Sequence, residues 1–320
     1  MQTIGIFHTK GGVGKSAVAV FLADFLSSLH ENRVLLVDLD PQGSCSRAIV
    51  PEETLAAAFA AGRSLPRLLT AAFDGTLDDA AVEAAIVTRP MQGRRRRGSV
   101  PLGEVGLLAT ESNDYRSFRD RLLEVPKQAR KGQLPLLRKT LDRVAANYDL
   151  AIIDFPGSEI PFWTLMGIRA TDQWLLPEIP DYVSAAALEG TNELLQQVGT
   201  ATGHIPKPLG TLLTICPRRG SGVYKKTRAA LGHLEKQKII PTLFPKDTEI
   251  LHRPEAQKAL DWEAEKAKTL VNRYGSTTSP FHVGLRKLAN EVLRRLGRPA
   301  GGDKLSFVAD LRRRMTDYWR

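Results

Sequence analysis

The chain has 320 residues, enough for one large domain or two ordinary ones, and 42% of them are hydrophobic and 25% charged. This balance is typical of folded soluble proteins and excludes a chain that is disordered throughout. The formal net charge of +10 is unevenly placed, because residues 201–320 carry 24 basic and 11 acidic side chains; this predicts a polyanionic partner, either nucleic acid or an acidic membrane surface.

The first residues and the cysteine content indicate a cytoplasmic protein. Residues 1–7 have no basic n-region and no small-residue cleavage site. No uncharged apolar run of about 18 residues occurs, so no transmembrane helix is expected. The two cysteines, Cys45 and Cys216, are too few for a disulfide framework or a cysteine-based zinc site.

Apolar strand-like runs alternate with helical patterns along most of the chain. Thr3–Phe7 and Arg33–Leu39 are apolar runs of the kind found in strands buried on both faces, and the apolar residues after Lys15 recur at helical spacing between them. This order is a βαβ unit. Further strands are predicted at Val105–Ala109, Leu150–Asp154, Gln173–Leu176, Leu209–Ile215 and Ile239–Thr242, and further helices at Leu134–Ala146, Val183–Val198 and Val223–Lys236. The alternation predicts an α/β fold with a mostly parallel sheet flanked by helices on both faces.

Residues 51–104 differ from their surroundings. They are rich in Ala, Arg and Gly and contain four consecutive arginines, Arg94–Arg97. We interpret them as an elaborated crossover with short helices and a mobile basic loop at 92–101. Because no clear linker is visible, we expect one domain over residues 1–302, followed by a basic amphipathic helix at 303–320.

The sequence from Lys10 to Ser16, Lys-Gly-Gly-Val-Gly-Lys-Ser, predicts a phosphate site. A glycine-rich turn ending in Gly-Lys-Ser between a strand and a helix is the P-loop pattern, in which backbone N–H groups and the helix N-terminus surround the phosphates. Lys15 is expected to reach the β- and γ-phosphates, and the Ser16 hydroxyl to ligate Mg²⁺. Thr9 replaces the usual first glycine and Lys10 adds a second lysine, so the loop is a variant. The predicted nucleotide-binding residues of the loop are Gly11, Gly12, Val13, Gly14, Lys15, Ser16 and Ala17.

This two-lysine loop resembles the deviant Walker A loop of the ParA/MinD group of P-loop ATPases. The resemblance implies the P-loop NTPase fold, ATP and Mg²⁺ as cofactors, and a homodimer that forms with ATP and separates after hydrolysis. It also implies that Lys10 reaches the nucleotide of the partner subunit, where a cation supplied in trans stabilises charge on the transferring phosphoryl group.

Two aspartate motifs extend the resemblance. The segment from Val37 to Gly43, Val-Asp-Leu-Asp-Pro-Gln-Gly, resembles the second-strand motif of the family, and a carboxylate at this end of a strand lies beside the phosphate crevice. The resemblance implies that Asp40 positions or activates the attacking water and that Asp38 supports the Mg²⁺ shell. The strand that ends at Asp154 has the Walker B form, which adds Asp154 to the magnesium group. Predicted catalytic residues are therefore Lys10, Lys15 and Asp40, and predicted metal residues are Ser16, Asp38 and Asp154.

Later segments match more loosely. Asp154 is followed by Phe-Pro-Gly where the family usually has x-Pro-Pro, and Gly157 is expected to present its N–H toward the γ-phosphate. Residues 212–218 resemble the strand whose end lies near the nucleotide base, which implies base-side contacts from Thr214, Pro217 and Arg218. The absence of an Asn-Lys-x-Asp guanine signature favours ATP over GTP. The resemblance covers about residues 1–50 and 105–300.

The basic residues after position 200 predict DNA binding. Each phosphate neutralised releases counterions, so such contacts give salt-sensitive, sequence-independent affinity. The predicted DNA-binding residues are Arg218, Arg219, Lys225, Lys226, Arg228, Arg286, Lys287, Arg294 and Arg295. Together with the resemblance they imply an ATP-dependent switch that binds nonspecific DNA, is nucleoid-associated, and segregates or positions a plasmid, chromosome or other cargo. The resemblance also implies a ParB-like activator protein.

The tail offers an alternative. Apolar residues from Leu305 to Trp319 recur at three- or four-residue spacing beside Arg312–Arg314, a pattern that can lie on an anionic bilayer, as in a MinD-like positioning ATPase. The same pattern fits a terminal helix that docks on the body of the protein. The Asp-x-Asp-Pro-Gln-Gly segment resembles ParA more than MinD, so we favour DNA over membrane.

Overall fold

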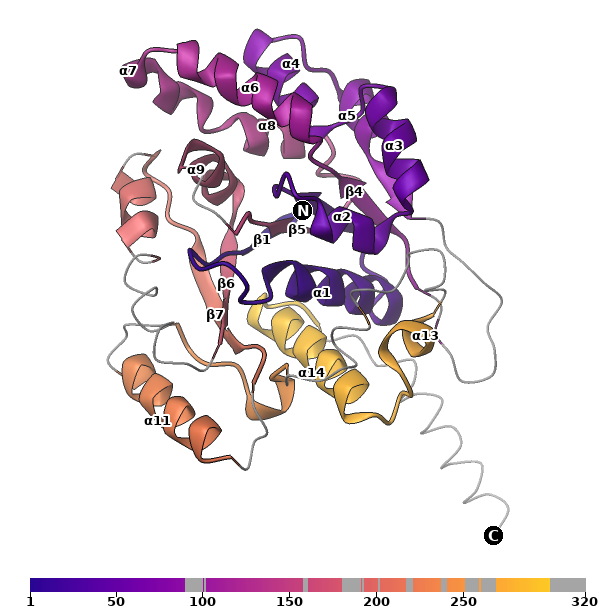
Figure 1. The fold of residues 1–320 in the computed structure, drawn as a ribbon, viewed down its shortest axis with the longest axis vertical. Coiled ribbons are helices and arrows are strands. Elements are labelled where there is room, and N and C mark those ends of the chain that lie inside the picture. The colour runs from indigo at the N-terminus through magenta and orange to yellow at the C-terminus, as the bar shows by residue number, and fades with distance from the viewer. Residues whose placement is uncertain are drawn as a thin grey trace.

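The computed structural model describes residues 1–89, 100, 102–157, 161–179, 191, 193–200, 202–216, 221–236, 241–250, 259 and 269–299. Its centre is a seven-stranded sheet with the strand order β3-β4-β2-β5-β1-β6-β7 (Figure 1). The strands are β1 (Gln2–Ile6), β2 (Val34–Asp38), β3 (Val87–Arg89), β4 (Val105–Leu108), β5 (Leu150–Asp154), β6 (Gln173–Glu178) and β7 (Lys207–Leu213). All neighbouring pairs are parallel except β3–β4, which is antiparallel. The predicted mostly parallel α/β fold is confirmed.

Alternate residues of the central strands enter two separate hydrophobic cores. Leu36 of β2 and Ile152 of β5 lie in one core, whereas Val37 and Ile153 lie in the other. Successive strand side chains point to opposite faces, so a sheet covered on both faces needs apolar residues at every position. This is why the strands read as continuous apolar runs in the sequence.

Helices cover both faces of the sheet (Figure 1). The first core includes residues of α1 (Lys15–Leu29), α2 (Ser44–Ile49), α3 (Glu52–Ala60), α13 (Leu270–Tyr274) and α14 (Pro280–Arg295). The second includes residues of α4 (Leu65–Asp74), α5 (Asp79–Ala85), α6 (Ser112–Glu124), α8 (Leu136–Asp142), α9 (Pro161–Ala170) and α11 (Gly222–Lys236). The short elements α7 (Lys127–Arg130), η1 (Lys131–Gln133) and η2 (Lys246–Thr248) lie in connections. The β1–α1–β2 unit thus holds its glycine loop at the carboxyl edge of the sheet.

A buried charge cluster fastens α1 to distant parts of the chain. Asp24 of α1 is fully buried and pairs with Arg89 of β3 and with Arg273 of α13, and it accepts a hydrogen bond from the Tyr274 hydroxyl. Burial alone would raise the pKa of Asp24, but the two guanidinium groups hold it below its usual value. Three segments far apart in sequence are therefore joined by one compensated carboxylate.

Most predicted elements are confirmed within a few residues, but several differ. Pro241 and Thr242, the described part of the predicted strand Ile239–Thr242, are not in a strand, and Leu243 makes only an isolated bridge to Thr211. Pro241 has no N–H to donate to a sheet ladder, which accounts for this error. The predicted helix at 134–146 shortens to α8 because Pro135 restricts its start. The antiparallel strand β3 and the helix α6 were not predicted.

Within the predicted crossover, residues 51–89 form α3, α4, α5 and β3. The Arg94–Arg97 loop and the tail helix predicted at 303–320 lie outside the described residues, as do residues 183–190 and 192 of the predicted helix Val183–Val198, whose residues 191 and 193–198 are helical. Across the described part of the chain, no helix is long and apolar enough to cross a membrane.

Candidate nucleotide-binding site

The glycine loop between β1 and α1 has a backbone that other residues rarely adopt. Gly12 has a φ of 74° and Gly14, which caps the N-terminus of α1, has a φ of 86°. Side chains with a Cβ disfavour this left-handed region, so the glycines are required by the turn. The loop leads directly into α1, whose first N–H groups and positive end are suited to bind an anion.

Lys15 sits inside the loop rather than on the surface. It is buried, and its Nζ donates a hydrogen bond to the Lys10 carbonyl at 3.2 Å. Burial lowers the pKa of Lys15, and the nearby Asp154 and Asp40 carboxylates oppose this change. A phosphate in the loop would supply the close anionic partner that this desolvated ammonium favours.

Asp38 and Asp154 end two neighbouring strands and stand opposite each other in the register. Asp38 is fully buried, and its Oδ2 accepts hydrogen bonds from the Ser46 N–H at 2.8 Å and the Ser46 hydroxyl at 2.6 Å. Its Oδ1 accepts from the Asp40 N–H at 3.0 Å. Burial raises the pKa of Asp38 to about 6, although the bonds from Ser46 and Asp40 work against the shift. Asp38 therefore braces Asp40 and the start of α2.

Asp154 is equally buried, but neither carboxylate oxygen has a hydrogen-bond partner of normal geometry among the described residues. Burial raises its pKa well above the usual value, and the Asp38 carboxylate adds to the rise, while the Ser16 hydroxyl and Lys15 oppose it. A buried carboxylate with two unused oxygens is costly unless a cation completes it. The site thus fits Mg²⁺, a hard cation that prefers oxygen ligands.

The donor set also suits a magnesium ion bound together with phosphate. No group of three His, Cys, Asp or Glu side chains that could hold a metal ion occurs in the part of the chain that is described. Mg²⁺ at nucleotide sites usually takes one or two protein ligands and completes its shell with phosphates and water. Ser16, Asp38 and Asp154 would hold it here, and its charge would neutralise the phosphate oxygens.

Asp40 and Gly157 lie at the mouth of the loop. Asp40 is partly exposed, and its Oδ1 accepts a hydrogen bond from the Gln42 N–H at 2.9 Å. A Cβ on Gly157 would lie 3.6 Å from the Gly11 Cα and 3.9 Å from the Lys15 Nζ. The backbone after Asp154 therefore borders the phosphate loop, and the contact of the Gly157 N–H with a γ-phosphate stays a prediction.

A buried histidine–glutamate pair behind the loop was not predicted. His8 and Glu178 are both fully buried, with 3.0 Å between His8 Nε2 and Glu178 Oε2. His8 Nδ1 accepts the Lys10 N–H at 2.8 Å, which assigns a neutral ring with its proton on Nε2. The pair thereby fixes the backbone of Lys10. The partners are 170 positions apart, so the only sequence signal was a histidine at the end of the first strand.

On the predicted base side, Thr214 is buried and its hydroxyl donates to the Val13 carbonyl at 2.7 Å. Thr214 therefore braces the loop, and its contact with a base stays a prediction. The next residue, Ile215, has a φ of 51°, which is strained for a β-branched residue and typical of functional sites. Pro217, Arg218 and Arg219 lie outside the described residues.

The predicted DNA-binding residues differ in how they are used. Lys225 and Lys226 are exposed on α11. Arg228 pairs with the buried Glu249, and Arg295 pairs with Glu291. Arg295 also donates to the carbonyls of Leu209, Thr242 and Leu243, and its guanidinium lies over the Phe244 ring. On the surface, Lys287 pairs with Asp247. Arg294 pairs with Glu291. Arg286 is partly exposed on α14.

Comparison with known sequences identifies the family of this chain. A family model described as AAA domain matches residues 1–209. The chromosome partitioning protein ParA of Caulobacter vibrioides is 28% identical over 262 residues, covering 79% of this chain and 84% of that protein. The sporulation initiation inhibitor protein Soj of Bacillus subtilis is 27% identical over 268 residues, covering 81% of this chain and 90% of that protein.

Solved structures share the fold at low identity. The pNOB8 ParA bound to nonspecific DNA has a TM-score of 0.67 at 19% identity, covering 92% of this chain and 98% of that one. The Cyanothece McdA complex with ATP has a TM-score of 0.66 at 19% identity, covering 93% and 97%. Cobyrinic acid a,c-diamide synthase of Mycobacterium smegmatis with ADP and magnesium has a TM-score of 0.64 at 21% identity, covering 93% and 96%.

Proposed function

The chain belongs to the AAA domain family, in its ParA/MinD group of P-loop ATPases, and from this premise we propose that it is an ATP-dependent partition or positioning switch. ATP with Mg²⁺ would bind at the loop and hold two copies together, and hydrolysis would release them. The observation that carries the proposal is a pair of buried charged groups at the phosphate loop: Lys15, whose pKa is lowered by burial, and Asp154, whose carboxylate oxygens have no hydrogen-bond partner of normal geometry among the described residues. Such charges are stabilised when a phosphate and a cation arrive together.

The roles of Asp40 and Lys10 follow from where they stand. Asp40 is the one carboxylate of the three at the site that is partly exposed, so it can hold the attacking water. The main chain of Lys10 is held by His8 beside the phosphate loop, and its side chain would act across the subunit interface. A lysine supplied in trans would stabilise charge on the transferring phosphoryl group, and an arginine used in this way contributes about 10³–10⁵ in rate.

DNA is the surface that we propose for the ATP-bound dimer, with a ParB-like activator as its partner protein. Lys225 and Lys226 on α11 are the best candidates for phosphate contacts, because both are exposed, whereas the neighbouring Arg228 and the more distant Arg295 are engaged inside the protein. The relatives named for chromosome partitioning and the ParA structure with nonspecific DNA support this choice.

The decisive experiment measures binding to nonspecific duplex DNA and to anionic vesicles, with Mg²⁺ and either ADP or ATP, across a salt series. We expect DNA binding that requires ATP and weakens steeply with salt, and no vesicle binding. Vesicle binding without DNA binding, lost when residues 303–320 are deleted, would instead favour the MinD-like alternative. Absence of nucleotide dependence on both surfaces would contradict the switch itself.

A Lys10→Ala variant tests the trans role in the same assay. It should keep ATP affinity close to wild type but lose about 10²–10³-fold of the stimulated hydrolysis, because the missing cation acts on the partner's nucleotide. Phosphate release measured with and without DNA reports this loss, and unchanged turnover would remove Lys10 from the mechanism.

A further inference from the structure

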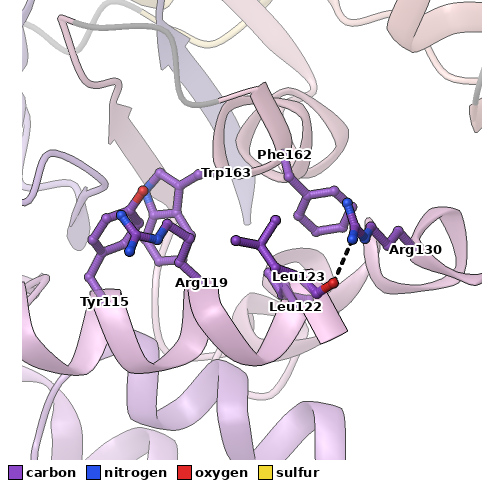
Figure 2. Close-up of a pocket in the computed structure, with 7 residues that line it drawn as sticks. All are labelled: Tyr115, Arg119, Leu122, Leu123, Arg130, Phe162 and Trp163. Atoms are coloured by element: carbon purple, nitrogen blue, oxygen red, sulfur yellow. Dashed lines mark hydrogen bonds between the residues drawn. The ribbon is translucent and has the colours of Figure 1, made fainter. Parts of the chain in front are cut away.

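A small open hollow lies on the outer side of the helices that cover the second core. Its cavity volume is about 50 Å³, and its apolar walls include Leu122 and Leu123 of α6 and Phe162 and Trp163 of α9 (Figure 2). Leu123 is 59% exposed, and among the large apolar side chains of the described residues only Val223, at 64%, is more exposed. Folding has thus left a leucine in water beside a hollow with aromatic walls.

The rim of the hollow is positively charged. Residues 116–131 carry six basic and two acidic side chains. At the mouth, Arg119 pairs with the adjacent Asp120, and both side chains are about half exposed, so the pair is weak and exchangeable. On the other side, Arg130 donates to the carbonyls of Leu123 and Val125 at 2.6 and 2.7 Å, which fixes a full positive charge there (Figure 2). An apolar hollow between two guanidinium groups complements a large apolar side chain flanked by carboxylates.

The floor of the hollow is linked to the nucleotide site. The Trp163 indole N–H donates to the Leu39 carbonyl at 2.6 Å, and Leu39 immediately precedes Asp40. The Trp163 ring is held edge-on by Tyr115 and Phe118, with centroid distances of 5.1 and 6.0 Å. A side chain that enters the hollow would lie against Trp163, and a shift of Trp163 would move or break its hydrogen bond to the carbonyl beside Asp40.

We propose that this Trp163 hollow binds an acidic segment of a partner protein through one large apolar side chain, and that its occupation changes ATP hydrolysis by moving Leu39 and Asp40 through Trp163. The coupling half of this inference rests on the proposed ATPase function, whereas the binding half does not. The basic rim selects against a basic segment, including the arginine-rich sequence at 312–314.

The binding half is tested with a defined peptide, acetyl-Glu-Asp-Glu-Leu-Phe-Glu-Asp-Glu-amide, titrated into the full chain by calorimetry. Leu123→Glu should weaken binding at least about tenfold, because it places a like charge at the apolar mouth. Val223→Glu on α11, where the valine is 64% exposed, is the matched control and should bind as wild type does. A peptide with lysines in place of all six acidic residues should not bind.

Several results would overturn the binding half. These are no binding to the wild-type chain, equal affinity for the Leu123→Glu variant, equal weakening by Val223→Glu, or equal affinity for the lysine peptide. If Leu123→Glu instead abolished the ATP-dependent dimer in sedimentation, the face would be an interface between copies, and the peptide proposal would fall.

The coupling half is tested with Trp163→Phe, which keeps an aromatic ring in the floor but removes the indole N–H. This variant should bind the peptide within about threefold of wild type, while the peptide-induced change in ATP turnover is lost. A retained response would overturn the coupling. Basal ATP turnover and DNA binding are measured on the same samples. Peptide binding without any ATP turnover would contradict only the proposed ATPase function. ATP turnover without peptide binding would contradict only the proposal that the hollow binds an acidic segment.

Discussion

Asp24 and Asp154 are both fully buried carboxylates in one α/β core, and their surroundings are opposite. Asp24 meets two arginines and a tyrosine hydroxyl, and its pKa is held below the usual value. Asp154 meets another carboxylate and no hydrogen-bond partner of normal geometry in the described structure, and burial raises its pKa. The difference teaches that a compensated buried charge joins parts of the fold, whereas an uncompensated one marks the place of a ligand.

The same contrast separates the basic residues of the C-terminal third. Arg295 gives its guanidinium to Glu291 and to three backbone carbonyls, and Arg228 gives its own to the buried Glu249. Lys225 and Lys226 stay exposed on α11. From the sequence alone, all of these basic residues are candidate DNA contacts. Their contacts in the structure show that Arg228 and Arg295 stabilise the fold, whereas Lys225 and Lys226 are exposed to solvent.

The largest expected effect is that of Asp24→Asn. Removing this carboxylate leaves Arg89 and Arg273 buried without their anion, and breaking a buried pair in this way costs about 3–5 kcal/mol. Urea unfolding at neutral pH measures the loss. A change below about 1 kcal/mol would mean that the cluster is not needed to hold α1, β3 and α13 together.

Asp154→Asn should act in the opposite direction on the nucleotide-free protein. The substitution removes a buried carboxylate whose ionised form is disfavoured by burial and by the Asp38 carboxylate, so the free energy of unfolding should rise by about 1–2 kcal/mol, while Mg²⁺-dependent ATP binding weakens. Urea unfolding and ATP titrations, carried out on the same preparation of each variant, compare the stability and the ATP affinity of Asp154→Asn with those of Asp24→Asn. The contrast between the two carboxylates would fail if both variants were destabilised equally.

A smaller effect is expected on DNA binding. Lys225→Ala with Lys226→Ala should weaken ATP-dependent binding about tenfold and reduce the salt slope by about two, because each lysine would neutralise one phosphate. Lys127→Ala with Lys131→Ala, which removes two exposed lysines from α7 and η1, is the matched control. Equal losses in the two double variants would argue against a localised DNA surface on α11.

The smallest effect concerns Glu291, whose hydrogen bonds from Arg294 and then Arg295 lower its pKa to about 2, against the effect of burial. Since the folded-state pKa is depressed, the stabilisation is complete above the usual pKa of 4.5 and is lost as the pH falls toward 2. The free energy of unfolding of the wild type should exceed that of Glu291→Gln by about 1 kcal/mol at neutral pH, and this difference should shrink as the pH falls. Urea unfolding of both proteins between neutral pH and pH 2 measures this difference in stability. A difference that grows as the pH falls would contradict the prediction.

Local features of the phosphate site could be predicted from the sequence because they depend on neighbours in the chain. The positive φ of Gly12 and Gly14 follows from a turn between an apolar strand and a helix, and Asp38 and Asp154 follow from strands that end in a carboxylate. The short edge strand β3 was missed, because three residues with alternating burial give too weak a periodic signal.

Contacts between distant residues had no local signal. His8 reaches Glu178, and Trp163 reaches Leu39, across separations of 170 and 124 positions. Neither pair belongs to a motif, so the brace on Lys10 and the link between the Trp163 hollow and Asp40 could not be expected in advance.

The fold class, the phosphate loop and the family could be predicted from the residue order, because periodicity and short spacings depend on neighbours in the chain. Which buried charges are compensated depends on contacts that form only in the folded protein. Asp24 finds Arg89 and Arg273, while Asp154 lies opposite Asp38 and its carboxylate forms no ion pair with an arginine in the described structure, according to which strands and helices become neighbours. Electrostatic energy depends on distance and burial in space, and the order of residues along the chain fixes neither.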